Sequence, residues 1–164
     1  MFTTVIPSDL VITGSETPAG DGSAHDALIG FYRAFNARDI DSLAHNWAAA
    51  DMPSMDNPLG GIRRGWQSIH DGYKKLFDGP ARVRIEFFDF TSQGVENCHL
   101  FVGRERGVCE TPTGRIELRI RTTRWFVRLD ENWRQLHHHG SIEEPALLVD
   151  YQRAIFGHEL GHAA

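Results

Sequence analysis

The chain has 164 residues and a formal net charge of −5 at pH 7. A chain of this length buries about two thirds of the surface that it exposes when unfolded, which predicts one hydrophobic core rather than two. The acidic balance argues against a nucleic-acid partner, because phosphates are bound by a basic face. No stretch is apolar for long enough to span a bilayer, and Pro7 and Asp9 stand where a signal peptide would have an apolar run. We therefore expect a cytoplasmic protein with no membrane partner.

Residues 1–22 are rich in Thr, Ser, Pro and Gly and show no periodicity. They are expected to form a flexible arm or a strand donated to a neighbouring subunit. A single domain is expected over residues 23–157, followed by a tail over residues 158–164.

Three helices are predicted before residue 80. Asp21 or Ser23 can cap the first helix and Asp41 the second, while Asp56 to Gly61 is a segment dense in turn residues. The apolar positions that repeat at helical spacing, and that we expect to face inward, are Leu28, Phe31, Tyr32, Phe35, Leu43, Trp47, Trp66, Ile69, Tyr73 and Phe77.

From Arg82 onward the apolar period changes to two, which is typical of strands. The strands are expected near residues 83–91, 95–110, 115–129 and 133–142. Pro145 begins a final predicted helix that ends at Phe156, with proline at its first position. Ser141 has two alternative roles, because it can cap this helix or line a cavity.

The strand over residues 115–129 has one mostly apolar face, formed by its even positions. Thr122 and Arg124 are the polar exceptions on that face, and buried polar groups require partners. The opposite face, with Arg119, Arg121 and Trp125, suits solvent or a partner subunit. The other charged residues of the C-terminal half are expected on a solvated or interfacial sheet face, namely Arg104, Glu105, Arg106, Glu110, Arg115 and Glu117.

The next strand carries three consecutive histidines, and His137, His139 and Ser141 share one of its faces by their spacing. Imidazole titrates near neutral pH, so an inward face would place proton-transfer groups in a cavity. The alternative is a partly exposed edge without a function. A turn with an even number of residues places Arg124 on the face of His137 and His139, whereas an odd turn separates them.

The run from Thr123 to Ser141 resembles the C-terminal hairpin of the nuclear transport factor 2-like superfamily, in particular its SnoaL-like group. It also resembles the association domain of calcium/calmodulin-dependent kinase II. Residues 31–43 are similar to the first two helices of this superfamily, and residues 55–69 to its pocket-edge turn and third helix. In the kinase domain the arginine that matches Arg124 points into the pocket, so the resemblance favours the even register.

The resemblance implies an α+β cone-shaped roll, in which a strongly curved antiparallel sheet wraps over about three N-terminal helices, with a further C-terminal helix. It implies a small-molecule pocket and a homodimer formed through the outer face of the sheet. The candidate pocket residues are Tyr32, Phe35, Trp47, Asp56, Trp66, Tyr73, Thr122, Arg124, His137, His139 and Ser141.

Two functions remain open at this point. In the first, His139 or His137 transfers a proton in a lyase or isomerase step on a small acidic or carbonyl metabolite, with Asp56 as a further catalytic candidate. Asp56 can equally form an Asx turn before Pro58. In the second, the pocket binds a ligand without turnover, or the dimer is the functional unit. A steroid isomerase mechanism is disfavoured, because Phe31, Asn57 and Thr122 stand at the positions of its three functional residues.

No cofactor is expected, and no metal. His158 and His162 match the HExxH pattern of zinc peptidases. Gly157 and Gly161 would weaken the helix that has to aim both histidines at one ion, so we interpret the match as accidental.

Overall fold

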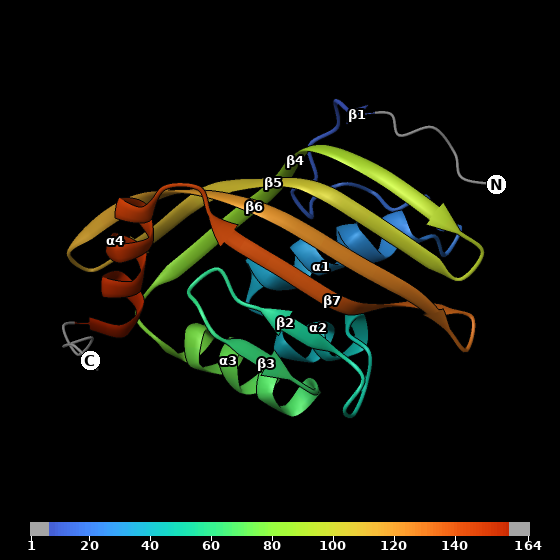
Figure 1. Ribbon diagram of the computed structural model, residues 1–164, viewed down its shortest axis with the longest axis horizontal. Helices are drawn as coiled ribbons and strands as arrows, with labels where there is room; N and C mark the ends of the chain where they lie inside the picture. Colours follow the sequence, from blue (N-terminus) through green and yellow to red (C-terminus); the bar gives the residue numbers. More distant parts are fainter. Residues whose placement is uncertain (1–6, 158–164) are drawn as a thin grey trace.

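A computed structural model describes residues 7–157, which form an α+β fold with seven strands and four helices (Figure 1). The sheet has the strand order β1-β4-β5-β6-β7-β2-β3. The elements are β1 (Pro7–Ser8), α1 (Ala24–Ala37), α2 (Ile40–Asn46), β2 (Ser54–Asp56), β3 (Ile62–Arg64), α3 (Trp66–Asp78), β4 (Arg82–Val95), β5 (Cys98–Thr111), β6 (Gly114–Leu129), β7 (Asn132–Ile142) and α4 (Pro145–Phe156).

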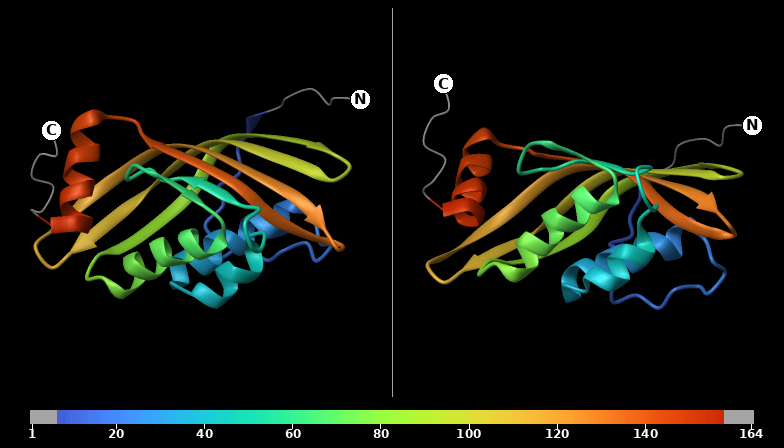
Figure 2. Two further views of the ribbon diagram at one scale, coloured as in Figure 1. Left: turned by 60° about the horizontal axis from the view of Figure 1, so that its bottom comes forward. Right: turned by 90° about the horizontal axis from the view of Figure 1, so that it is seen from below.

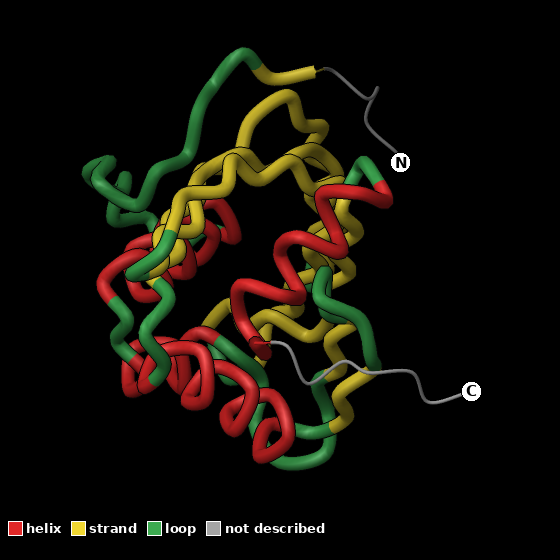
Figure 3. Tube along the Cα trace, turned by 90° about the vertical axis from the view of Figure 1, so that its left-hand side faces the viewer, coloured by secondary structure: helices red, strands yellow, loops and turns green. Residues whose placement is uncertain are grey.

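The sheet is strongly curved, and its concave face covers α1, α2 and α3 (Figure 2). Strands β4 to β7 form an antiparallel meander, as expected, while β2 pairs with β7 in parallel. The short strands β2 and β3 flank the predicted turn and were not foreseen. Helix α4 lies across one end of the fold, between the sheet and α3 (Figure 3). The predicted cone-shaped roll is confirmed. Among the described residues, no helix combines the length and the apolar character needed to cross a membrane.

Residues 7–22 lie against their own chain, in contrast to the expected flexible arm or donated strand. Strand β1 pairs with β4, and Ile12 forms a bridge with Phe87. The side chain of Ile12 is buried in the core. The HExxH residues His158 and His162 lie outside the described part of the chain.

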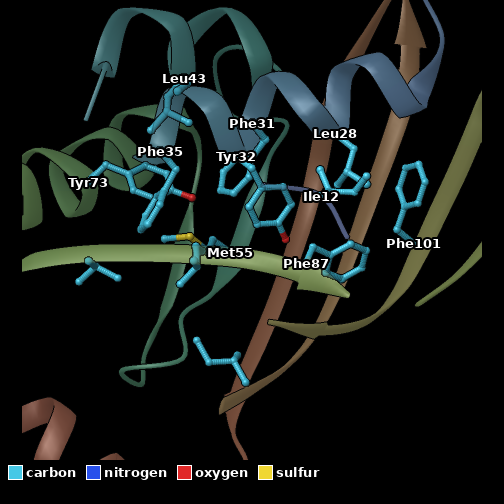
Figure 4. Packing of buried hydrophobic residues seen from close by; sticks show 14 of the residues in the cluster. Ile12, Leu28, Phe31, Tyr32, Phe35, Leu43, Met55, Tyr73, Phe87 and Phe101 are labelled. Carbon is cyan, nitrogen blue, oxygen red and sulfur yellow. The ribbon is translucent and has the colours of Figure 1, made fainter. Parts of the chain in front are cut away.

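Helix α1 contributes the predicted apolar stripe to the core. Leu28, Phe31, Tyr32 and Phe35 are all buried, and Figure 4 shows the three aromatic side chains extending from α1 toward the sheet. Ser23 caps this helix by accepting a hydrogen bond from the Asp26 amide at 3.2 Å.

The expected caps of two other helices are wrong. Asp39, not Asp41, caps α2, because its carboxylate accepts a hydrogen bond from the Ser42 backbone amide at 2.9 Å. The N-cap of α4 is Glu144, which makes no side-chain capping bond, while Ser141 belongs to β7. The proline at the first position of α4 is present as predicted.

The register of β6 against β7 decides which side chains reach the concave face. The hairpin turn is Asp130–Glu131, because Leu129 pairs with Asn132, and both turn residues have positive φ angles, as in a type I′ turn. This even turn would place His137 opposite Arg124. However, a β-bulge between Trp125 and Phe126 leaves Leu136 without a partner, so that Arg124 lies opposite His138. The prediction that Arg124 shares a face with His137 and His139 is therefore wrong.

Two glycines on the inner face of β5 bring its backbone close to β4. A Cβ atom on Gly107 would lie 1.9 Å from the Arg84 carbonyl oxygen, and one on Gly103 would lie 2.4 Å from the Phe90 Cβ atom. Glu105 stands between these glycines and is buried. The assignment of Glu105 to a solvated or interfacial face is consequently wrong.

We predict that Gly107→Ala lowers the free energy of unfolding by about 1–3 kcal/mol, because a backbone atom must move to admit the methyl group. Denaturant unfolding measures this change. Gly114→Ala is the matched control, since nothing lies within 4 Å of a Cβ atom at that position. Equal stability of the two variants would contradict the close approach of β5 and β4.

Candidate functional site

A cavity of about 80 Å³ lies between the concave face of the sheet, α3 and α4. Its walls are mostly apolar, with a small number of polar groups, which is the usual composition of a small-molecule site. The lining residues are Phe31, Phe35, Met55, Asn57, Pro58, Leu59, Arg63, Gly72, Tyr73, Lys75, Leu76, Val83, Ile85, Glu105, Ile120, Arg124, His138, Tyr151, Ile155 and Phe156. The volume suits a ligand no larger than a single ring or a short chain, or a few water molecules.

Arg124 is buried at this cavity and is held by three side chains. Its Nη2 atom donates to Oε1 of Glu105 at 2.7 Å, its Nη1 atom to Oε1 of Gln135 at 2.7 Å, and its Nε atom to the Tyr32 hydroxyl at 2.9 Å. Tyr32 in turn donates to Oε1 of Glu105 at 2.6 Å. The Arg124 guanidinium also lies 3.6 Å from the centre of the Phe31 ring. The positive charge of Arg124 is thus compensated within the protein.

The ion pair of Arg124 and Glu105 is almost fully removed from water, since each side chain is 1% exposed. Such a pair costs desolvation energy, which only good geometry and additional hydrogen bonds can offset. Tyr32 and Gln135 provide those bonds. Burial raises the pKa of Tyr32 well above its ordinary value, so this hydroxyl remains a proton donor to Glu105. We call these four side chains the buried network: Arg124, Glu105, Tyr32 and Gln135.

His138 is the polar group of the cavity that the protein does not satisfy. Its side chain is buried, and neither ring nitrogen has a hydrogen-bond partner among the described residues. Burial holds the pKa of His138 well below its ordinary value, and the charge of Arg124 lowers it further. The imidazole is therefore neutral at pH 7, with one nitrogen able to donate and the other able to accept a hydrogen bond.

Gly140 allows the loop after β2 to close over this histidine. A Cβ atom on Gly140 would lie 3.0 Å from the ring of Pro58 and 3.1 Å from Nε2 of His138. Pro58 lines the cavity together with Asn57 and Leu59. The turn that the sequence placed at the pocket edge is thus a wall of the cavity.

His137, His139 and Ser141 lie on the outer face of the sheet, where they pair with Trp125, Thr123 and Arg121 respectively. Nδ1 of His137 lies 2.8 Å from the Ser54 hydroxyl, and Nδ1 of His139 lies 3.2 Å from Oδ2 of Asp56. The His139 side chain is 50% exposed and that of Asp56 is 36% exposed. The predicted placement of these residues in the cavity is wrong, because the bulge at Leu136 reverses the faces of the strand that follows it.

The other candidates from the sequence divide into two groups. Phe35, Tyr73 and Arg124 line the cavity. The candidates that contribute to the surrounding core instead are Tyr32, Trp47, Trp66 and Thr122. Trp47 and Thr122 are buried, and each has a polar side-chain atom without a hydrogen-bond partner in the described part of the chain, while Trp66 is partly buried at the start of α3.

Sequence reasoning missed His138, Glu105, Gln135, Arg63 and Lys75. One signal for Glu105 is present in the sequence. It occupies the same alternating series as Phe101 and Cys109, which marks an inward face. Within residues 7–157, no group of three His, Cys, Asp or Glu side chains is arranged to hold a metal ion.

The sequence profile of the SnoaL-like domain matches residues 25–145. No protein of curated function shows detectable sequence similarity. A domain assigned as a calcium/calmodulin-dependent protein kinase type II association domain from Thiobacillus denitrificans is 21% identical, with a TM-score of 0.64 over 74% of this chain and 96% of its own.

Two further structures are similar to the chain over comparable lengths. A protein of the nuclear transport factor 2-like family from Streptomyces avermitilis, assigned as a dehydratase, is 18% identical, with a TM-score of 0.65 over 71% of this chain and 90% of its own. A protein from Novosphingobium aromaticivorans, assigned as an aromatic ring hydroxylase, is 16% identical, with a TM-score of 0.66 over 79% of this chain and 94% of its own. At these identities the similarity establishes the fold, and the assigned functions differ from one relative to the next.

We predict that Arg124→Met lowers the free energy of unfolding by about 3–5 kcal/mol, because Glu105 is left buried without its partner. Adding Glu105→Gln to this variant should recover part of the loss, since the uncompensated charge is then removed. Denaturant unfolding of the two single variants and the double variant measures the coupling.

The exposed pair of Arg119 and Glu144, with 3.0 Å between Nη1 and Oε1, supplies the control. Arg119→Met should change the free energy of unfolding by at most about 1 kcal/mol. An Arg124→Met variant as stable as this control would contradict the role given to the buried network.

Proposed function

The chain belongs to the SnoaL-like domain family of the nuclear transport factor 2-like superfamily, and on this premise we propose that its cavity binds a small organic molecule. The ligand has a mainly apolar body and one hydroxyl or carbonyl group, which hydrogen-bonds to His138. The observation that carries this proposal is the buried imidazole of His138, both of whose ring nitrogens lack a hydrogen-bond partner within residues 7–157.

The hydrogen bonds of the neighbouring Arg124 disfavour a ligand anion at this place and so support a neutral ligand group at His138. Arg124 already bonds to Glu105, Gln135 and Tyr32, so a ligand anion beside it would have to compete with a carboxylate at 2.7 Å. A hydroxyl or carbonyl group meets no such competition at His138. A buried polar group without a partner is costly, so a ligand that satisfies this imidazole gains affinity.

We predict that the protein binds phenol more tightly than toluene, by roughly threefold to tenfold, because phenol adds one hydrogen bond at nearly equal size. Ligand titrations followed by NMR measure both affinities. In His138→Leu the preference for phenol should disappear.

His139→Leu is the matched control for this measurement, because it removes an imidazole from the same strand on the outer face. The preference for phenol should persist in this variant. Equal binding of phenol and toluene by the unmodified protein would overturn the assignment of His138.

The second candidate function is proton transfer in a lyase or isomerase step, with His138 as the acid/base group in place of His137 and His139. A neutral imidazole can take a proton from the carbon beside a ligand carbonyl and return it to another atom. The charge of the resulting imidazolium would be balanced by the enolate that forms. One structural relative is assigned as a dehydratase, which is a lyase reaction.

Proton transfer can be tested without knowing the natural substrate. We expect the protein to accelerate exchange of the α-hydrogens of cyclohexanone in deuterated water, as followed by proton NMR, because His138 would remove and return those protons. His138→Gln should abolish the acceleration. Exchange at the buffer rate in the unmodified protein would favour the noncatalytic binding module.

We propose that the protein forms a homodimer through the outer face of the sheet. Val102 and Trp125 lie on this face and are 41% and 39% exposed. The charged residues Arg119 and Glu110 form ion pairs within the chain, with Glu144 and Arg115 respectively. The interface that we propose therefore depends mainly on the apolar side chains.

Light scattering at micromolar concentration should give twice the mass of the chain. Trp125→Glu should yield a folded monomer, because it places a charge in the proposed apolar contact. A monomeric unmodified protein would exclude this assembly.

A further inference from the structure

The charged groups of the cavity do not balance. Among residues 7–157, Arg63, Lys75 and Arg124 line it together with a single carboxylate, that of Glu105. Arg124 and Glu105 compensate each other at 2.7 Å, and His138 is neutral. Arg63 and Lys75 therefore remain as an excess of positive charge among the described lining residues.

Arg63 is positioned on the surface of α3 rather than extended freely into solvent. Its Nη1 atom donates to the Ser68 carbonyl oxygen at 3.0 Å, and the side chain is half-buried. Its guanidinium crosses α3 at Gly72, where a Cβ atom would lie 2.6 Å from Nε of Arg63. Glycine is a poor residue for the middle of a helix, and here its missing side chain provides the space for Arg63.

Lys75 lies one helical turn after Gly72, on the same face of α3. Its Nζ atom is 5.4 Å from the centre of the Phe156 ring, so the lysine spans from α3 to α4 at the edge of the cavity. Gly72, over which Arg63 passes, and Lys75 consequently share one face of α3.

The acidic residues of α3 make their direct contacts with other groups, although hydrogen bonds from His70 and Gln67, together with the charge of Arg63, lower the pKa of Asp71. Asp71 accepts a hydrogen bond from Gln67 at 2.9 Å and lies 3.2 Å from Nδ1 of His70. Asp78 pairs with Lys74 at 2.5 Å. Across residues 7–157, no carboxylate lies within ion-pair distance of Arg63 or Lys75. We refer to these two residues as the cationic rim.

We propose that the cationic rim binds the carboxylate of the ligand, and that the ligand is a small organic acid. Its apolar body fills the cavity, and a hydroxyl or carbonyl group at its far end reaches His138. This inference rests on the proposed function, to which it adds the ligand class. Anion recognition is thereby assigned to two cations that form no ion pair within residues 7–157, instead of to the buried Arg124, which is paired with Glu105.

The test compares 4-hydroxybenzoate with 4-hydroxybenzamide by isothermal titration calorimetry on the full-length protein. The two probes have the same ring and the same hydroxyl group, and they differ in that one carries a charged carboxylate and the other a neutral amide. We expect the acid to bind roughly threefold to tenfold more tightly, with the difference decreasing as salt is added. In the double variant Arg63→Gln and Lys75→Gln, the affinity for the acid should fall to that for the amide.

Arg64→Gln combined with Lys74→Gln is the matched control. It removes the same charge from neighbouring positions that do not line the cavity, so the preference for the acid should persist. Gly72→Ala provides a second test that keeps every charge. It should displace Arg63 and weaken binding of the acid alone, while thermal unfolding shows that the fold is retained.

The outcomes separate the two proposals. Equal binding of acid and amide, or an equal loss in the control variant, would overturn the cationic rim and leave the role of His138 intact. Failure of both probes to bind at millimolar concentration would overturn the ligand class and the proposed function together. Binding of the amide that is unaffected by His138→Leu would reject the role of His138 alone.

Discussion

The buried ion pair of Arg124 and Glu105 is the constraint on which the arrangement of the site depends. Two opposite charges are held on adjacent strands, each almost completely removed from water. Such a pair persists only where its remaining hydrogen-bonding capacity is satisfied. Tyr32 from α1 and Gln135 from β7 supply those bonds, so the network joins the helical layer to three strands of the sheet.

The same pair determines the chemistry of the cavity. Because Arg124 is compensated by Glu105, its charge is not free to bind a ligand anion. Burial holds the pKa of His138 well below its ordinary value, and the charge of Arg124 lowers it further. The outcome is a neutral, unpartnered imidazole at an apolar wall. In our proposals recognition is divided between this imidazole inside the cavity and the cationic rim of Arg63 and Lys75 at its edge.

Much of the fold could be predicted from local patterns. The stripe of α1 and the alternation of β4 to β7 depend on residues close in sequence, and Pro145 marks the start of α4. The resemblance to a known superfamily also indicated correctly that Arg124 points inward. The site was harder to predict, because a single unpaired residue, Leu136, reverses the faces of the rest of β7. A bulge of this kind leaves no clear mark in the sequence, since Leu136 suits either side of a strand.

Glu105 was misassigned for a different reason. It stands between Arg104 and Arg106, and charged neighbours on a strand suggest a solvated face. Its true partner is Arg124 on the next strand, and only the assembled sheet brings the two together. The alternation of its own strand marks Glu105 as inward, whereas the partner that allows its burial is seen only in the assembled sheet.

Long-range proton–nitrogen NMR spectra of the histidine rings provide the most direct test of this account. The protein would be titrated without ligand from about pH 7.5 to about pH 5.5, with the His138 signals identified by their loss in His138→Asn. We expect His138 to stay neutral as the pH passes ~6.5, where a free histidine is half protonated, because burial and the charge of Arg124 both oppose a second positive charge. Protonation of His138 at or above this pH would contradict it.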